Sequence, residues 1–341
     1  MASTLRLGFT GDVMLGRLVD RRQRSRSVDA VWGDLLDELQ SLDGLFINLE
    51  CVLSRMGHPW RRTYRPFHFR ADPRWAVPAL ERAGVDWVSL ANNHTLDYEV
   101  DALYDTIDRL DRADIAHAGA GRTEATAHAP ARLSIDGTEI ALLAFTDNTP
   151  EYAAGPDSPG VAYVSFDLDD AESRRTLVST IDDAKKTNPD LLIASLHWGP
   201  NMVSEPSSAF QDVGRWLIEQ GVTLVHGHSA HVVQGIEIHD GCPILYDTGD
   251  FVDDYAVDET LRNDRGFLFE LHVQRDGTPD VLRLIPTEIY ECAVHTASET
   301  ATNWSHRRLR ERSEPFGTRI ERKDDELLIS LDRKRNSGTD R

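Results

Sequence analysis

Residues 5–17, LRLGFTGDVMLGR, begin with an apolar run that changes abruptly to polar residues at Asp12. Short apolar runs alternate with amphipathic stretches through the first two thirds of the chain, which is typical of layered α/β folds. The stretch at 5–17 therefore predicts the first strand of an α/β domain. Strands are expected at 5–9, 44–47, 86–90, 139–145, 191–196 and 224–225, and helices at 31–42, 73–83, 100–113, 171–186 and 207–220.

From Gln234 onward the pattern changes to runs typical of β-strands, separated by turn signals such as HDG and RDGTPD. We interpret these runs as the β-rich second half of the same core, so a single domain is expected over residues 1–315. Beyond about residue 314 charged residues dominate, and residues 316–341 are expected to form a partly disordered extension with a frayed tail at 334–341. The strand-like runs are GIEIH (235–239), CPILYDT (242–248), RGFLFELHV (265–273) and VLRLIPTEI (281–289).

The composition restricts the classes of partner. The 341-residue chain has a formal net charge of −20, which argues against non-specific binding to nucleic acid, because the phosphate backbone would be repelled. Its 3 cysteines lie far apart, so neither a disulfide framework nor a cysteine zinc site is expected. The chain shows no apolar stretch of membrane-spanning length and no signal-peptide pattern, so no direct membrane insertion and a cytoplasmic location are expected.

Metal-competent side chains stand at the ends of five apolar runs. In open α/β sheets, sites form where the carboxyl ends of several strands converge, so these five ends are expected to build one shared site. The residues are Asp12; Asn48 and Glu50 in LFINLE; Asn92, Asn93, His94 and Asp97 in WVSLANNHTLD; His197 in LLIASLHWGPN; and His226, His228 and His231 in LVHGHSAH.

This mixture of carboxylate, amide and imidazole ligands contains no thiolate, which favours Mn, Fe or Zn, as one or two ions. Each residue alone has a structural alternative. Asp12 could cap a helix, His94 could be a turn residue, and His197 could be a hydrogen-bonded core histidine. Their joint occurrence at strand ends favours the divalent metal site.

The ordered motifs GDVMLGR, NLE, NNHTLD, LHWG, GHSAHVVQG and LYDTGDF resemble the CapA family of capsule and poly-γ-glutamate synthesis proteins, also called PGA_cap, over about residues 5–255. That family is similar to the calcineurin-like metallophosphoesterases. The resemblance implies a four-layer α/β/β/α sandwich, with two mixed β-sheets facing each other and helices outside.

The resemblance also implies roles for individual residues. His94 would contact the phosphate and help to protonate the leaving group. Met14 stands where phosphoesterases have a metal-binding histidine, so the first metal has lost a ligand, and Asp250, Asp253 or Asp254 could replace it. Asn48 and Asp97 are further candidates. The implied ligands are Asp12 and His231 for the first metal, Glu50 as a bridge between both, and Asn93, His197 and His228 for the second.

Four arginines, Arg17, Arg61, Arg62 and Arg65, suit an anionic substrate, because arginine binds phosphates and carboxylates through paired hydrogen bonds. Alternatively, they neutralise an acidic surface. The leading hypothesis is a metal-dependent hydrolase of phosphoester-like bonds. The alternative is a non-catalytic capsule or poly-γ-glutamate biosynthesis protein that binds an anionic polymer or a partner. The sequence leaves the substrate, the metal and the oligomeric state open.

Overall fold

The computed structural model describes residues 4–331, and the tail predicted at 334–341 lies outside the described residues. Within residues 4–331 the larger sheet has ten strands and contains both parallel and antiparallel pairs. Its order is β19 (Glu321–Lys323), β20 (Glu326–Ser330), β17 (Pro279–Tyr290), β16 (Arg265–Val273), β1 (Leu5–Val13), β2 (Gly44–Leu49), β5 (Val85–Ser89) and β6 (Ala116–Ala118), with β15 (Asp250–Val252) beside β1 and β18 (Ala293–Thr296) beside β17.

The smaller sheet is also mixed, since its central strands are parallel and its two edge strands are antiparallel. In the described part of the chain its six strands run in the order β13 (Ile236–His239), β14 (Cys242–Leu245), β12 (Leu224–His228), β11 (Leu191–His197), β9 (Thr138–Thr146) and β8 (Ala131–Ile135). Two short ribbons pair β3 (Val52–Leu53) with β4 (Arg70–Ala71), and β7 (Ala120–Gly121) with β10 (Gly160–Val161).

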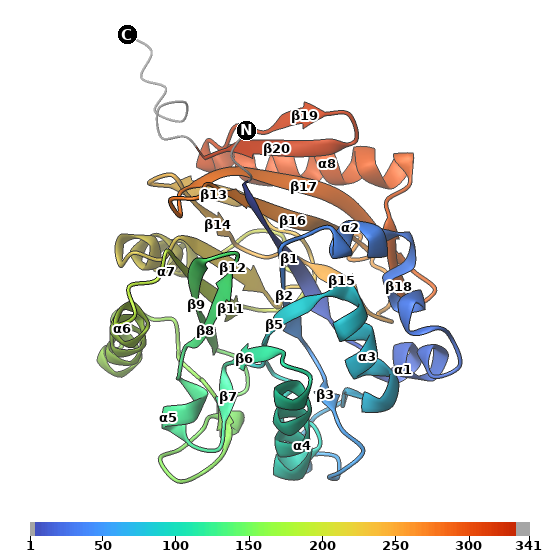
Figure 1. Ribbon diagram of the computed structural model, residues 1–341, viewed down its shortest axis with the longest axis vertical. Coiled ribbons are helices and arrows are strands. Elements are labelled where there is room, and N and C mark those ends of the chain that lie inside the picture. The colour runs from blue at the N-terminus through green and yellow to red at the C-terminus, as the bar shows by residue number, and fades with distance from the viewer. Residues whose placement is uncertain (1–3, 332–341) are drawn as a thin grey trace.

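Helices cover the outer faces of both sheets (Figure 1). One group packs on the larger sheet: α1 (Arg17–Gln23), η1 (Val28–Leu35), α2 (Leu36–Gln40), α3 (Pro73–Ala83) and α4 (Glu99–Arg112). On the smaller sheet lie α6 (Ala171–Lys185) and α7 (Ser208–Glu219). The remaining helical segments are α5 (Glu124–Ala127), η2 (Pro150–Tyr152), α8 (Glu299–Ser313) and η3 (Glu314–Phe316).

Three hydrophobic clusters separate these layers, and strand alternation produces them. In β2, Phe46 faces the cluster between the two sheets and Ile47 faces the cluster under the helices. In β9, Leu142 faces the sheet–sheet cluster and Leu143 the outer one. Successive side chains of a strand point to opposite faces, so each of these strands has two buried faces. The four-layer α/β/β/α sandwich with two mixed sheets is thereby confirmed.

Side-chain caps set the starts of the outer helices. Asp72 accepts a hydrogen bond from Arg74 N (3.1 Å) at the start of α3, and Pro73 occupies the first helical position. Ser207 accepts one from Phe210 N (3.2 Å) at the start of α7. These caps satisfy backbone donors that have no partner inside the helix.

The helix predicted at 31–42 is broken in the structure. Gly33 has a φ of +51°, and a Cβ there would lie 2.2 Å from the carbonyl oxygen of Val294. Only glycine permits both this conformation and this close approach of β18. The chain therefore forms η1 and α2 in place of one helix, while Leu35 and Leu39 still face the core as expected.

The segment predicted as a partly disordered extension, residues 316–341, contains two strands in its described part. Strand β20 pairs with β17, with Leu328 opposite Arg283. Leu327, Ile329 and Leu331 are buried in the cluster between the sheets, so residues up to 331 belong to the same core. Their period of two spans only five residues and is flanked by charges, which obscured the strand in the sequence. Across residues 4–331, no helix combines the length and the apolarity that crossing a membrane requires.

Glu270 of β16 is a buried carboxylate between two arginines, and its substitution tests this part of the sheet. It accepts hydrogen bonds from Arg6 Nε (2.6 Å), Arg283 Nη1 (2.7 Å) and His272 Nε2 (2.6 Å). Burial alone would raise the pKa of Glu270, but His272 and the two arginines hold it well below its usual range. Its contribution to stability is therefore present above the ordinary carboxyl pKa and is lost as the pH falls toward the depressed value.

We expect Glu270→Gln to lower the free energy of unfolding by about 2 kcal/mol at pH 7, because two partly exposed arginines lose their anion. Urea denaturation measures the effect, and the difference between the two proteins should shrink below about pH 4. Glu326→Gln is the matched control, since Glu326 is 29% exposed and, among residues 4–331, forms its ion pair with Arg283. Equal losses in both variants would contradict the argument.

Candidate metal centre

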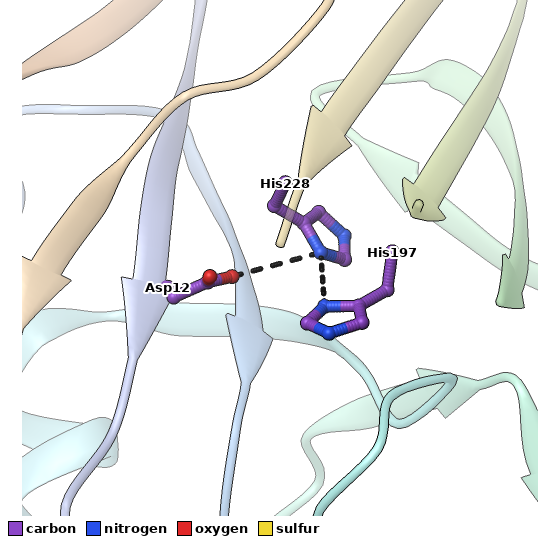
Figure 2. A group of neighbouring side chains, drawn as sticks. All are labelled: Asp12, His197 and His228. Carbon is purple, nitrogen blue, oxygen red and sulfur yellow. Dashed lines mark hydrogen bonds and ion pairs between the residues drawn. The ribbon is translucent and has the colours of Figure 1, made fainter. Parts of the chain in front are cut away.

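Two strand ends from the smaller sheet face one from the larger sheet across the sandwich. Figure 2 shows Asp12 of β1, His197 of β11 and His228 of β12 pointing toward one another. His228 Nδ1 lies 3.0 Å from His197 Nδ1 and 3.6 Å from Asp12 Oδ1. Burial lowers the pKa of His197 to about 3 and that of His228 well below its usual value, so both rings are neutral. A neutral imidazole has the free lone pair that a metal ligand needs.

A second group lies on the other side of Asp12. His231 Nδ1 is 2.8 Å from Asp250 Oδ1 and 3.3 Å from Asp12 Oδ2. Burial opposes protonation of His231, but the nearby carboxylates of Asp250 and Glu50 hold its pKa well above the usual range, so a metal ion bound here would displace the ring proton. The two groups, Asp12–His197–His228 and Asp12–His231–Asp250, are buried and share Asp12.

Close backbone packing places Asp250 beside Asp12. In the parallel pair of β1 and β15, Asp12 stands opposite Asp250. A Cβ on Gly11 would lie 2.2 Å from the carbonyl oxygen of Gly249, so only glycine allows β15 to approach β1 this closely. Asp250 therefore lies beside Asp12. Met14 itself is buried, with its sulfur 3.1 Å from Gly16 N.

The turn that carries His231 is conformationally strained. Ser229 has a φ of +115° and His231 a φ of +60°, which side chains with a Cβ rarely adopt. Asp247 stabilises this turn by accepting hydrogen bonds from Ala230 N (2.6 Å) and Gly249 N (2.8 Å). One buried carboxylate thus ties the histidine turn to the segment that leads into Asp250.

Several buried oxygens of the site have no hydrogen-bond partner among the described residues. Such oxygens are typical of a cation-binding site, because a buried polar atom without a partner is costly. Together with the imidazoles they form a mixed nitrogen and oxygen donor set, which suits Mn, Fe or Zn. The residues present therefore fit a divalent metal. The oxygens are Asp12 Oδ2, Glu50 Oε1, Asn93 Oδ1 and Asp250 Oδ2.

Asn48 positions Asp12. Its Nδ2 donates to Asp12 Oδ1 (2.7 Å), and its Oδ1 accepts from Asn92 Nδ2 (3.1 Å). Glu50 lies farther out, where Oε2 accepts from Tyr255 OH (3.1 Å). Glu50 Oε1 is 4.0 Å from His197 Nε2, and burial raises the pKa of Glu50 well above its usual value. The end of β2 thus supplies an amide that orients Asp12 and, two residues later, a carboxyl group at the edge of the cluster.

His94 stands where the buried cluster meets a cavity. Its Nδ1 is 2.6 Å from Asp97 Oδ2, and its Nε2 is 3.8 Å from Glu50 Oε1. The ring stacks on Phe69, with 3.7 Å between ring centroids. Asp97 Oδ2 also accepts a hydrogen bond from Phe69 N (2.6 Å), so Asp97 fixes both the imidazole and the aromatic ring against it.

The cavity above His94 has a volume of about 530 Å³. The four arginines predicted to bind the substrate do not all line it. Arg17 and Arg65 line the cavity, as do Asn93 and His231. Arg61 and Arg62 line a different depression, and Arg62 Nη2 pairs with Glu99 Oε2 (2.5 Å). Only two of the four arginines are therefore at the site.

His226 and Tyr255 are two residues for which the strand-end pattern in the sequence does not predict the position in the site. His226 lies beneath the cluster, where its Nε2 is 2.7 Å from the carbonyl oxygen of Thr10, as expected of a core histidine. Tyr255 was not anticipated, although it holds Glu50 and lines the cavity. Phe69 and Asp247 were also missed. The motif LYDTGDF, which contains Asp247 and leads toward Tyr255, was the available signal.

The fold and this centre define a four-layer α/β/β/α protein with a buried Asp/His cluster suited to divalent metal. The sequence profile of the bacterial capsule synthesis protein PGA_cap matches residues 6–255. The chain belongs to this family.

Two relatives illustrate the family. A "Probable polyglutamine synthesis accessory protein" of Mycobacterium tuberculosis is 31% identical over 312 residues, covering 87% of this chain and 80% of that protein. The "Capsule biosynthesis protein CapA" of Bacillus anthracis is 28% identical over 333 residues, covering 97% of this chain and 78% of that one.

Among solved structures, the calcineurin-like phosphoesterase YfkN from Bacillus subtilis is similar, with a TM-score of 0.41 and 14% identity. The match covers 93% of this chain and 100% of that one. The family assignment rests on the sequence matches and not on this structural likeness.

Proposed function

We propose that this protein is a metal-dependent hydrolase of phosphoester-like bonds. One observation carries the proposal: Asp12 is shared by two buried ligand groups, and His231 of one group lines the same cavity as His94, Arg17 and Arg65. A carboxylate shared between two groups is the arrangement that a two-metal hydrolytic centre requires.

The residues that would hold metal follow from the two groups. Asp12, His197 and His228 would hold one ion, and Asp12, His231 and Asp250 the other. Asn93 and Glu50 have unpartnered oxygens within the described structure and would complete the ligand set. A bound divalent ion supplies Lewis-acid activation of water and of a phosphoryl oxygen.

His94 is the proposed proton donor to the leaving oxygen. Asp97 Oδ2 lies 2.6 Å from its Nδ1, which orients the ring and would stabilise the imidazolium whose Nε2 proton passes to the leaving oxygen. Arg17 and Arg65 would hold the non-bridging oxygens, because guanidinium groups bind phosphate through paired hydrogen bonds. Phe69 closes one face of the imidazole and keeps water away from it.

Titration of the metal-free protein with Mn²⁺ tests this function. The rate of hydrolysis of bis(p-nitrophenyl) phosphate should rise as the ion binds and should level off when binding is complete. A chelator should abolish the activity, and added metal should restore it. Binding of metal without turnover of any phosphomonoester or phosphodiester would contradict the proposal.

A second candidate function is non-catalytic binding of an anionic polymer in capsule or polyglutamate synthesis. The names of the relatives and the two cavity arginines favour it. In that case Arg65→Glu should weaken binding of poly-γ-glutamate, while removal of metal should have little effect. Binding that is indifferent to the charge reversal would count against this candidate.

A further inference from the structure

The wall of the cavity is largely apolar, although its floor is polar. Phe69 stacks on His94, and Tyr255 lies 5.8 Å from Phe69 between ring centroids. A site for a purely hydrophilic anion has no need of such a wall, whereas apolar walls are usual in pockets that bind ligands with an apolar part. The apolar and aromatic lining residues are Pro66, Phe67, Phe69, Met202, Tyr255 and Ala256.

Exposed apolar side chains continue this wall around the mouth of the cavity. Phe67 is 55% exposed and Met202 37% exposed, and both line the cavity. Large apolar side chains are seldom grouped on the surface of a highly charged chain without a ligand to cover them.

The cations at the mouth are stacked on aromatic rings. Arg17 Cζ lies 5.1 Å from the ring centroid of Phe67, and Arg65 Cζ lies 4.7 Å from that of Tyr152. Arg65 Nε and Nη2 are buried and make no hydrogen bond to any described residue. Arg17 Nε lies 3.4 Å from Asp254 Oδ1, and Arg65 Nη2 lies 3.9 Å from Glu151 Oε1, so Arg65 is the less closely paired of the two cations.

We propose that the cavity takes an amphiphilic phosphoester, with its anionic head at the metal floor beside Arg65 and an aromatic or long alkyl group on the wall formed by Phe67, Met202 and Tyr255. The inference rests on the proposed function for the position of the head. The leaving group, whose oxygen His94 would protonate, would lie along the Phe69 side of the wall, because Phe69 stacks directly on that imidazole.

Binding of phosphonates, which are not hydrolysed, tests the inference apart from activity. Isothermal titration of the metal-loaded full chain would compare phenylphosphonate, octylphosphonate and methylphosphonate. We expect the phenyl or the octyl compound to bind at least about tenfold more tightly than the methyl compound. A preference for phenyl identifies an aromatic body, and a preference for octyl identifies a lipid-like body.

Two exposed residues of the same loop provide the matched variants. Phe67→Ala should reduce the preference by about fivefold, because an aromatic contact with the ligand is lost. Tyr64→Ala should leave it unchanged, since Tyr64 is 90% exposed and does not line the cavity. Met202→Ala should act like Phe67→Ala and serves as the second variant.

Equal binding of all three phosphonates, or a preference that survives both Phe67→Ala and Met202→Ala, would overturn the inference. Failure of the proposed function is a different result. In that case no ester is hydrolysed, yet the phosphonates still bind with the expected preference.

Discussion

His94→Ala is expected to reduce hydrolysis of a phosphodiester by about 10²- to 10⁴-fold, the usual contribution of a general acid. His94 belongs to neither of the groups that contain Asp12, so the metal content should remain nearly intact. Steady-state kinetics with bis(p-nitrophenyl) phosphate and elemental analysis of the same sample measure both quantities.

The matched control is a histidine outside the site. His239 is 26% exposed and lies 3.5 Å from Glu219, so His239→Ala should leave the rate unchanged. Asp97→Asn should lower the rate less than His94→Ala does, because Asp97 orients the imidazole and does not itself transfer the proton. If His94→Ala retained full activity, the proposed role of this residue would be wrong.

Asp12→Asn is expected to weaken binding of both metal ions, by at least about 100-fold each, because an amide replaces the carboxylate that the two groups share. His228→Ala should weaken one ion and Asp250→Asn the other. Calorimetric titration of the metal-free variants with Mn²⁺ measures the two affinities. The asparagine variants are conservative, because asparagine has nearly the same shape as aspartate.

Asn48→Ala tests a residue that positions the ligand Asp12 without binding the metal itself. Asn48 donates to Asp12 Oδ1 and is not itself a member of either group, so its loss should cost about 10- to 100-fold in affinity. An Asp12→Asn protein that bound two ions as tightly as the original chain would contradict the shared-ligand arrangement.

The convergence of the strand-end side chains could be predicted because their positions follow from the α/β pattern. Asp12, His197 and His228 each end an apolar run, and strand ends in this fold meet at one edge. Asp250 could be suggested only as a replacement for the missing histidine. Its place beside Asp12 depends on the parallel pairing of β15 with β1 and on the close approach at Gly11, which no local pattern encodes.

Loop residues were harder to predict than strand residues. Arg61, Arg62 and Arg65 are nearly adjacent in sequence, yet only Arg65 lines the cavity, because side-chain direction in a loop follows no fixed period. Tyr255 was missed for a related reason. It follows β15 by three residues and reaches Glu50 only because β15 and β2 both pair with β1, which brings the segments after them together.

The measurement that tests the central claim most directly is the metal content of the original chain, purified without chelators or nickel resin. The account predicts about one or two equivalents of Mn, Fe or Zn per chain, because two buried groups share Asp12. No bound metal, even after reconstitution with each of these ions, would contradict it.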